Sequence, residues 1–392
     1  MMITVDEAIA AVLEGAAPLA SERVGLSVLV DRILAEDVSA EITQPPFAAS
    51  AMDGYAIRFE DAKAGASLKV IGEAPAGAPF AGRVGAGEAV RVFTGGVIPD
   101  GADHVVIQED VTRDGERITI NESQDSPRHI RAAGIDFCKG DILAKRGAQL
   151  HEIHGSIFAA ANVKHVSVHR RPHVAVFSNG DELREPGAAL KSGQIINSNH
   201  YALCEMIRRW GGEVEYLGCA ADSEDGIREV FRRGRDADIV VPIGGASVGD
   251  YDFVKSAFAK EGGMTRFEKV AVRPGKPTWC GSMGATRVVG LPGNPASAIV
   301  TAALFVQPLV RRLAGEKWTV PFGKAQLTAP LAANGGREAY LRGEVGNGKA
   351  APARDQDSSL LLPFASANAL IRCVSNAPAL NIGDEVEFVL LR

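Results

Sequence analysis

Short loops rich in glycine, proline and charged side chains follow the apolar runs in the second half of the chain. Glycine lets backbone N–H groups approach a ligand closely, and a helix that begins in such a loop presents the positive end of its dipole. Both features suit a bound phosphate, so these loops predict an anion-binding cradle. The loops are Ser178-Asn179-Gly180-Asp181-Glu182, Gly244-Gly245-Ala246-Ser247-Val248-Gly249-Asp250-Tyr251-Asp252, Arg273-Pro274-Gly275-Lys276-Pro277 and Pro292-Gly293-Asn294-Pro295.

Charged residues in and near these loops could add two further kinds of chemistry. Arg273 and Lys276 are held apart by a rigid Pro-Gly pair and would offer fixed positive charge to a small oxyanion. Glu182, Asp222 and Asp252 would bring carboxylates to the same place, and such acids beside a phosphate usually share a hard cation such as Mg²⁺. The cation and the acids would then polarise a phosphoryl bond.

The same residues also allow plain structural interpretations. Asp222 directly precedes an expected helix and could be only its N-cap, and Asp181 could be a turn residue. Arg273 and Lys276 could be solvated loop charges, and a single glycine-rich turn indicates little by itself. The functional interpretation therefore depends on the four loops meeting at one place.

The surrounding elements decide whether these loops meet. From His173 to about Leu313, short apolar runs alternate with amphipathic helical patterns. This alternation predicts a doubly wound, mainly parallel sheet with helices on both faces. In such a sheet the ligand lies outside the carboxyl ends of the strands, so the four loops would gather at one edge. The expected strands are Val174–Phe177, Val214–Leu217, Ile239–Ile243, a strand ending near Val272, and Val288–Leu291.

The last helix of this α/β region is expected to begin with Asn294 as N-cap and Pro295 at its first position. Its apolar stretch, Ala296 to Val310, is too short to span a bilayer and indicates a buried helix. Pro308 predicts a kink, because proline lacks the N–H that the helix needs.

Regions of different character flank the α/β region. Residues 1 to about 43 are expected to be helical, with a second helix capped by Ser27, and Gly147 to Asn162 is helical again. Between them, glycine and proline recur among short β-rich runs, which indicates a small inserted β domain. The expected boundaries are 1–45 and 140–172 for a helical, mixed domain I, 46–139 for the inserted β domain II, 173–316 for the α/β domain III and 317–392 for a β-barrel-like domain IV.

Composition limits the class of protein. The net charge is -6, so the surface as a whole does not attract nucleic acid or a membrane of acidic lipid. The 5 cysteines contain no CxxC pair, which argues against disulfides and structural zinc and favours a reducing compartment. Asp6 and Glu7 stand where an export signal needs basic and then apolar residues, so a cytoplasmic location is expected. His151 and His154 form an HxxH pair, but without a third ligand nearby they favour an ordinary surface helix.

Taken in order, the motifs of this chain resemble those of the molybdopterin molybdenumtransferase (MoeA, gephyrin E-domain) family over essentially the whole length. The run from Ser50 to Ala56, combined with Leu291-Pro292-Gly293-Asn294-Pro295, is highly specific. That family usually has threonine at the position of Asn179 and lysine at the position of Arg273. The motifs are Pro45-Pro46-Phe47, Ser50-Ala51-Met52-Asp53-Gly54-Tyr55-Ala56, Thr94-Gly95-Gly96, Arg131 with Gly134 and Asp136, Gly180-Asp181-Glu182-Leu183, Gly244 to Gly249, Pro274 to Pro277, Leu291 to Pro295, and Ser366-Ala367-Asn368.

The resemblance implies an enzyme that inserts molybdenum from molybdate into adenylylated molybdopterin and releases AMP, assisted by Mg²⁺. It also implies that domain III is of the molybdopterin-binding type. The implied assembly is an elongated homodimer, in which Asp53, Thr94 and Asp136 complete the pocket of the other subunit.

The resemblance further implies a role for individual residues. Glu182, Asp222 and Asp252 would position the metal and the nucleotide phosphate. The residues implied to hold molybdate or the pterin phosphate are Ser247, Arg273, Lys276 and Ser366, with Arg337 as a further candidate. The other implied binding residues are Gly180, Asp181, Gly244, Gly245, Gly249, Pro277, Pro292, Gly293, Asn294 and Pro295.

Two other functions stay open at this stage. Relatives of this module serve as non-enzymatic scaffolds that bind receptor loops, and a molybdopterin adenylyltransferase shares the α/β domain alone. The three additional expected domains favour the insertion step over adenylyl transfer. Candidate partners are a molybdopterin adenylyltransferase and molybdoenzymes, and the residues do not separate molybdate from tungstate.

Overall fold

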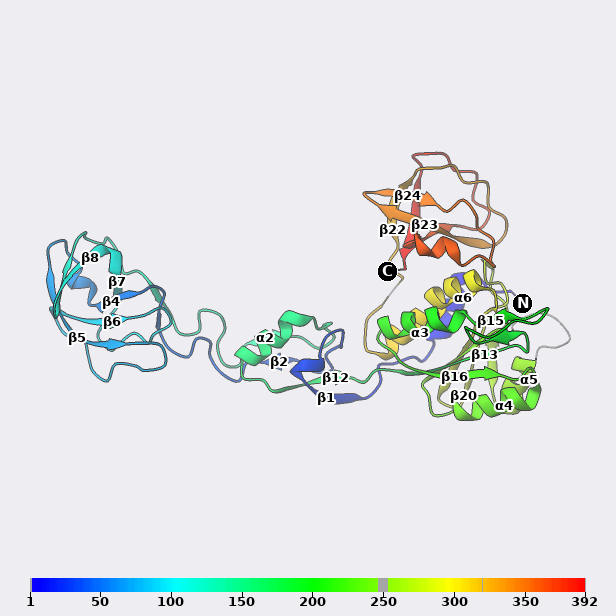
Figure 1. Ribbon diagram of the computed structural model, residues 1–392, viewed down its shortest axis with the longest axis horizontal. Helices are drawn as coiled ribbons and strands as arrows, with labels where there is room; N and C mark the ends of the chain where they lie inside the picture. Colours follow the sequence, from blue (N-terminus) through cyan, green and yellow to red (C-terminus); the bar gives the residue numbers. More distant parts are fainter. Residues whose placement is uncertain (1, 246–252, 319, 392) are drawn as a thin grey trace. The chain divides into compact units, whose positions relative to one another are not determined.

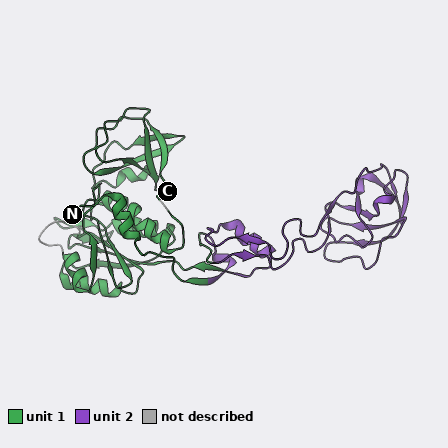
Figure 2. Ribbon diagram, turned by 180° about the vertical axis from the view of Figure 1, so that it is seen from behind, with its two compact units in different colours: residues 1–22, 31–35, 167–392 green, residues 23–30, 36–166 purple. Residues whose placement is uncertain are grey.

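The computed structural model describes residues 2–245, 253–318 and 320–391. The chain forms two compact units (Figure 2): unit 1 contains residues 1–22, 31–35 and 167–392, and unit 2 contains residues 23–30 and 36–166. Unit 2 therefore interrupts unit 1 in the sequence. Residues 1–22, which begin the chain, group with the later residues of unit 1. The four expected domain boundaries stay a prediction.

Unit 1 contains a six-stranded sheet that is mainly parallel, as predicted. Its strand order is β16-β13-β17-β21-β20-β18. The first four strands run parallel, whereas β20 is antiparallel to both of its neighbours, β21 and β18. The chain passes from β13 to β16 on one side and then returns to β17 on the other, which creates a switch point between β13 and β17. The strands are β13 (His173–Asn179), β16 (Glu213–Ala220), β17 (Ile239–Ile243), β18 (Met264–Phe267), β20 (Trp279–Met283) and β21 (Thr286–Gly290).

Helices cover both faces of this sheet (Figure 1). Because side chains alternate along a strand, Val174 and Val176 of β13 pack in the core formed with α1, α3, α6 and α7. Ala175 and Phe177 pack in the opposite core, formed with α4 and α5. The helices are α1 (Val5–Leu13), α3 (Asn199–Arg209), α4 (Glu224–Arg233), α5 (Phe253–Lys260), α6 (Pro295–Thr301) and α7 (Gln307–Leu313).

Helix α1 is fixed at both ends. At its start, Thr4 and Glu7 form a capping box, in which each side chain accepts a hydrogen bond from the backbone N–H of the other. At its end, Arg287 of β21 donates to the carbonyl of Val12 and so satisfies a group that has no partner within the helix. These contacts, together with its buried apolar face, attach the first helix to the sheet.

The prediction of a second N-terminal helix that is capped by Ser27 is wrong. The chain forms only the 3₁₀ turn η1 (Leu26–Val28) there. Asp31 follows with a φ of 62°, which a right-handed helix does not allow. The apolar side chains Leu29 and Ile33 are buried all the same, so burial is achieved without the helix.

The last helical segment of the α/β region is buried and irregular. The span Pro295–Leu313 is long and apolar enough to cross a membrane, but 89% of it is buried inside the protein, as predicted for a core helix. Helix α6 passes into a π-helical segment, η4 (Ala302–Val306), just before Pro308 of α7. Because proline offers no N–H to the preceding turn, the regular α-helical hydrogen bonding is interrupted there. The wider π-helical turn of η4 lies where the sequence predicted a kink.

The C-terminal part of unit 1 is a closed barrel, as expected for a β-barrel-like domain. Strands β23, β24, β22, β26 and β25 pair in that order, and β25 pairs back onto β23. Strand β19, which we predicted for the central sheet, instead pairs in parallel with β23, so that assignment is wrong. The strands and the short helix here are β19 (Val272–Arg273), β22 (Gly323–Leu327), β23 (Glu338–Gly346), β24 (Lys349–Pro352), η5 (Leu362–Ala365), β25 (Ala369–Cys373) and β26 (Glu385–Leu390), and a short pair β14 (Leu183–Arg184) and β15 (Ile195–Ile196) belongs to the α/β part.

Unit 2 contains a six-stranded sheet of its own, with the order β7-β4-β6-β5-β9-β8. The β-rich runs read from the sequence correspond to β6, β7 and β9, and the predicted helical return corresponds to α2. The elements are β2 (Val38–Ser39), β3 (Ala49–Ser50), β4 (Gly54–Ile57), η2 (Phe59–Asp61), β5 (Ser67–Ala74), β6 (Glu88–Val92), β7 (His104–Ile107), η3 (Gln108–Asp110), β8 (Val111–Asp114), β9 (Arg117–Ile120), β10 (Ile130–Arg131), β11 (Ile142–Ala144) and α2 (Glu152–Ala160), while β1 (Ser21–Gly25) and β12 (His165–His169) include residues of both units.

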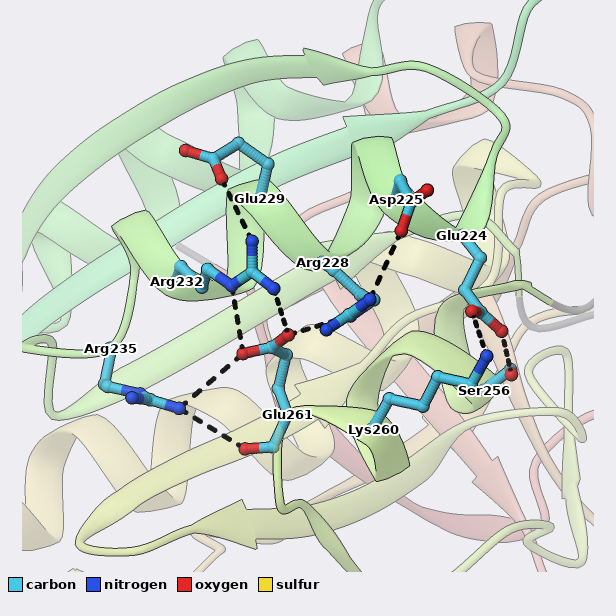
Figure 3. A network of polar contacts seen from close by, with 9 residues as sticks. All are labelled: Glu224, Asp225, Arg228, Glu229, Arg232, Arg235, Ser256, Lys260 and Glu261. Carbon is cyan, nitrogen blue, oxygen red and sulfur yellow. Dashed lines mark hydrogen bonds and ion pairs between the residues drawn. The ribbon is translucent and has the colours of Figure 1, made fainter.

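A network of ion pairs joins α4 to the end of α5 (Figure 3). The Glu261 side chain is only 7% exposed and accepts hydrogen bonds from Arg228 Nε at 2.9 Å and Arg232 Nη2 at 3.0 Å. Lys260 and Ser256 of α5 donate to Glu224 at the start of α4. The two helices that cover one face of the sheet are therefore locked together by charge as well as by apolar packing.

Candidate functional site

A cavity of about 550 Å³ lies at the carboxyl ends of the parallel strands in unit 1. It opens beside the switch point between β13 and β17, where ligands bind in open α/β sheets. Its lining residues are 178–179, 182–183, 195–199, 243–245, 277, 292–295 and 359. Three of the predicted loops, 178–182, 244–245 and 292–295, therefore meet here, together with Pro277 of the fourth.

Two glycines of this cavity, Gly244 and Gly245, are required by its geometry. Gly244 and Gly245 have φ values of +98° and +62°, in the region that favours glycine. A Cβ on Gly245 would lie 2.3 Å from Cγ2 of Val254, so no side chain fits. Gly293 faces the same turn, since a Cβ there would lie 3.6 Å from Cα of Gly244. The two glycine loops thus present bare backbone to the cavity.

The loop before α6 is held by side chains, although not in the way we predicted. Asn294 occupies the N-cap position, but its side chain does not cap the helix. Its Nδ2 instead donates to Ser358 Oγ at 3.0 Å, while the Ser358 carbonyl accepts from Ala296 N–H at 3.0 Å. On the other side, Asn199 Nδ2 donates to the Gly293 carbonyl at 2.7 Å.

A loop of the barrel, residues 355–360, therefore forms part of the cavity wall. Arg342 holds this loop: it is 2% exposed and donates to the carbonyls of Leu360 at 2.8 Å and Asp357 at 3.0 Å. Burial lowers the pKa of the Arg342 guanidinium, against the attraction of Asp355 and Asp357. Sequence reasoning missed Ser358, Ser359 and Arg342, because nothing local in the sequence indicates that this loop reaches α6.

The carboxylates near the cavity have distinct surroundings. Glu182 lines the cavity, and its carboxylate covers Gly180, where a Cβ would lie 2.4 Å from Glu182 Oε2. Asp181 Oδ1 accepts from the Asp222 N–H at 3.1 Å and so ties the loops after β13 and β16 together. Asp222 is not the N-cap of α4, because Ser223 fills that role by accepting from the Gly226 N–H.

The expected metal site stays a prediction. Asp252, its third expected ligand, lies outside the described residues, as do Ser247 and Gly249. Across residues 2–245, 253–318 and 320–391, no three or more His, Cys, Asp or Glu side chains are grouped as a metal would require.

The predicted cationic residues and Ser366 do not line this cavity. Arg273 belongs to β19 and lines a second cavity of about 560 Å³ on the barrel, together with Tyr340 and Arg354. Lys276 is exposed next to Pro277. Ser366 lines a third cavity of about 500 Å³ with Lys349 and Asn368. The expectation that all four loops leave the central sheet fails at β19, which pairs with the barrel.

Arg337 is half-buried next to this barrel edge. Its carbonyl accepts from Asn334 Nδ2 at 2.8 Å. This contact concerns the backbone of Arg337, so it leaves the predicted role of its guanidinium untested.

Two predicted residues of unit 2, Asp53 and Thr94, contact each other directly. The Thr94 N–H and hydroxyl both donate to Asp53 Oδ1, at 2.7 and 2.9 Å. The hydrogen bond from the Thr94 N–H contributes most to lowering the pKa of Asp53, and the bond from the hydroxyl adds to it. The Asp53 carboxylate is therefore ionised at neutral pH.

The third predicted residue of unit 2 has a different neighbourhood. Asp136 lines another cavity of unit 2, about 750 Å³, with Phe137 and Ile157.

In α2, His154 Nδ1 accepts from the His151 N–H at 3.1 Å, so this histidine caps its helix, and burial lowers its pKa.

The chain matches three family descriptions, arranged along nearly its whole length. They are "MoeA N-terminal region (domain I and II)" over residues 3–162, "Probable molybdopterin binding domain" over residues 175–312 and "MoeA C-terminal region (domain IV)" over residues 324–391. A molybdopterin molybdenumtransferase of Haemophilus influenzae is 39% identical over 325 residues, 82% of this chain and 80% of that protein. One from a Nostoc species is 37% identical over 336 residues, 83% of this chain and 77% of that protein.

Solved structures agree with these sequence matches. The crystal structure of a molybdopterin biosynthesis MoeA protein from Pyrococcus horikoshii superposes with a TM-score of 0.88, at 31% identity and with 100% of both chains covered. A second crystal structure of MoeA from that organism gives a TM-score of 0.82 at 28% identity, again over 100% of both chains. The chain therefore belongs to the MoeA family.

Proposed function

We propose that this protein is a molybdopterin molybdenumtransferase. It inserts molybdenum from molybdate into adenylylated molybdopterin and releases AMP, in the biosynthesis of the molybdenum cofactor. The observation that carries the proposal is the cavity at the switch point of the sheet, where three glycine-containing loops and the Glu182 carboxylate converge. Relatives that bear this name and align with most of the chain support it.

The cavity suits the phosphoanhydride of such a substrate. The bare backbone of Gly244, Gly245 and Gly293 lets phosphate oxygens approach closely. Lys276 lies next to Pro277 of the cavity wall and would attract the molybdate oxyanion. Arg273 would contribute from the neighbouring cavity of the barrel edge.

The described wall of this cavity offers a divalent cation one carboxylate, that of Glu182. The carboxylate oxygens of Glu182, with those expected from Asp222 and Asp252, are the hard ligands that Mg²⁺ prefers. When bound, Mg²⁺ would withdraw charge from the phosphoanhydride oxygens. Glu182 would be one ligand of the ion, and Asp181 would keep the loop of Asp222 in place through its hydrogen bond.

We further propose a cytoplasmic homodimer. In it, the Asp53–Thr94 pair of one subunit would complete the cavity of the other, as the resemblance implied. An ionised carboxylate held by two hydrogen bonds is a suitable group to orient a cation or a proton donor at the substrate.

The decisive experiment incubates the purified protein with adenylylated molybdopterin, molybdate and Mg²⁺, and measures AMP by chromatography. We expect AMP release that depends on molybdate and on Mg²⁺. Release that is independent of molybdate would contradict the insertion reaction. Formation of adenylylated molybdopterin from ATP would instead indicate an adenylyltransferase. If the protein binds these ligands but forms neither AMP nor adenylylated molybdopterin, the result would favour a non-enzymatic scaffold.

A further inference from the structure

Lys276, the residue proposed to attract molybdate, lies in the turn between β19 and β20. It is exposed, whereas Gly275 before it and Thr278 two residues after it are buried. A lysine ammonium stands at the end of a long flexible chain, so the region it can reach depends on how the backbone holds its Cα. The contacts of the turn decide that position.

The two peptide groups on either side of the Lys276 Cα are both held by hydrogen bonds. The Gly275 carbonyl accepts from the Thr278 N–H at 3.0 Å and from the Thr278 hydroxyl at 2.8 Å. The Lys276 carbonyl accepts from the Val270 N–H at 3.0 Å. Because each peptide group is planar, these bonds restrain the two planes that meet at the Lys276 Cα, and with them the direction in which its side chain leaves the backbone.

Helix α6 restrains the same turn from another side. Gly275 has a φ of +117°, and a Cβ there would lie 2.2 Å from Cγ2 of Thr301 in α6. Thr301 is 0% exposed, and its hydroxyl donates to the Ser297 carbonyl at 2.7 Å. The turn therefore packs directly on the helix that starts at Pro295 of the cavity wall.

We propose that Thr278 is a positioning residue for molybdate, whose hydroxyl fixes the Gly275–Lys276 peptide group and so aims the Lys276 ammonium. The inference rests on the proposed function, because it takes Lys276 to bind the oxyanion. Thr278 is 0% exposed, so it acts through the backbone and does not touch the ligand. Of the three hydrogen bonds to the two carbonyls, it supplies the one that a side chain donates. A substitution can therefore remove this bond and leave both N–H donors in place.

The test replaces Thr278 with valine, which keeps the shape and the N–H but lacks the hydroxyl. Without that hydrogen bond the peptide group before Lys276 can rotate further, so binding of molybdate must restrict more of the lysine's freedom. The molybdate concentration for half-maximal AMP release should rise about threefold to tenfold in Thr278→Val. The turnover rate at saturating molybdate should stay close to that of the natural chain. A lower turnover rate with natural molybdate dependence would overturn the proposal.

Two further variants separate the hydroxyl from packing and from stability. Thr278→Ser keeps the hydroxyl and should keep the natural molybdate dependence. Thr286→Val removes an equivalent bond, from a buried hydroxyl to the Arg235 carbonyl at 2.7 Å, at the amino end of β21 and thus at the edge of the sheet opposite the cavity. It should lower the thermal midpoint about as much as Thr278→Val and leave the molybdate dependence unchanged. If either variant raises the molybdate requirement as much as Thr278→Val does, the positioning role is refuted.

A double variant shows whether Thr278 acts through Lys276. In the Lys276→Ala background the ammonium to be aimed is gone, so adding Thr278→Val should raise the molybdate requirement no further. A further rise by the same factor as in the natural background would contradict the proposal.

Equilibrium dialysis with molybdate separates this inference from the proposed reaction, because it needs no turnover. Molybdate affinity should fall about threefold to tenfold in Thr278→Val. A natural chain that binds molybdate but releases no AMP would reject the reaction alone, and one that binds no molybdate would overturn both. Natural molybdate affinity in Thr278→Val, together with weakened binding in Lys276→Ala, would reject this inference alone.

Discussion

At the scale of single residues, the site consists of side chains whose partners lie far away in the sequence. Asp181 and Asp222 are joined by one hydrogen bond across two loops, and Asn294 is joined to Ser358 of the barrel. Sequence reasoning identified Asp181, Asp222 and Asn294 as candidates, because residue type and motif are local. It failed on Ser358 and assigned Asn294 a capping role, because partners across 64 residues leave no local pattern.

Lys276 offers a test of the oxyanion role at this scale. Lys276→Ala removes an exposed ammonium beside Pro277 of the cavity wall. If it binds molybdate by a charge-assisted hydrogen bond, the molybdate concentration for half-maximal AMP release should rise roughly tenfold or more. Lys324→Ala is the control, since that lysine pairs with Glu385 on the barrel at 2.7 Å. Equal molybdate dependence in the two variants would argue against the role.

At the scale of elements, strand–helix alternation was a reliable guide and isolated short runs were not. The sheet of β13, β16, β17 and β21 was predicted from this alternation, and its central strands β13 and β17 are buried on both faces and largely apolar. Strand β19 has only two residues, and its pairing with β23 depends on a barrel that begins 50 residues later. Its run of apolar residues could not show which sheet it joins.

The Arg342 side chain organises one such element, the loop 355–360. Arg342→Met keeps much of the buried volume but leaves the carbonyls of Leu360 and Asp357 without donors, so we expect a loss of about 2 to 4 kcal/mol in unfolding free energy. Hydrogen exchange should accelerate in residues 355–360, with weaker substrate binding. Arg354→Met changes an exposed arginine directly before the same loop. It should neither lower the unfolding free energy nor accelerate hydrogen exchange in that loop. Unchanged exchange in Arg342→Met would disprove this role.

The ion-pair network of α4 and α5 makes a prediction about stability and pH. Burial alone would raise the pKa of Glu261, but hydrogen bonds from Arg228 and Arg232 outweigh it and lower the pKa. Glu261→Gln should therefore cost about 1 to 3 kcal/mol in urea unfolding at pH 7. Because the pKa of Glu261 is lower in the folded than in the unfolded protein, its ionised carboxylate stabilises the fold at any pH above the ordinary glutamate pKa of about 4.3. This stabilisation is lost as the pH falls through the pKa that Glu261 has in the folded protein.

The comparison of the two proteins by urea unfolding checks both parts. The difference in unfolding free energy between the natural chain and Glu261→Gln should have its largest value at pH 7 and should become smaller below about pH 4. Glu229→Gln is the matched control, because Glu229 is 62% exposed and contacts only Arg232, at 3.5 Å, among the pairs of Figure 3. A gap that is constant with pH would show that charge is not the cause.

At the scale of the whole molecule, the expected homodimer predicts complementation between two inactive variants. Asp53→Ala and Glu182→Ala should each abolish AMP release. Refolded together, they should regain up to about a quarter of the natural activity, because half of a random mixture is mixed dimers with one intact cavity each. Absence of any recovery, with mixed dimers demonstrated by mass spectrometry, would exclude completion of the cavity by the second subunit.

The interruption of unit 1 by unit 2 also decides when the first helix is buried during synthesis. Helix α1 is translated well before one of its core partners, α7, which ends at Leu313. At roughly 5 to 20 residues per second, α1 waits about 15 to 60 s for that surface to be translated. Its apolar face therefore stays incompletely covered during that interval, and α1 completes its native contacts only after α7 has been made.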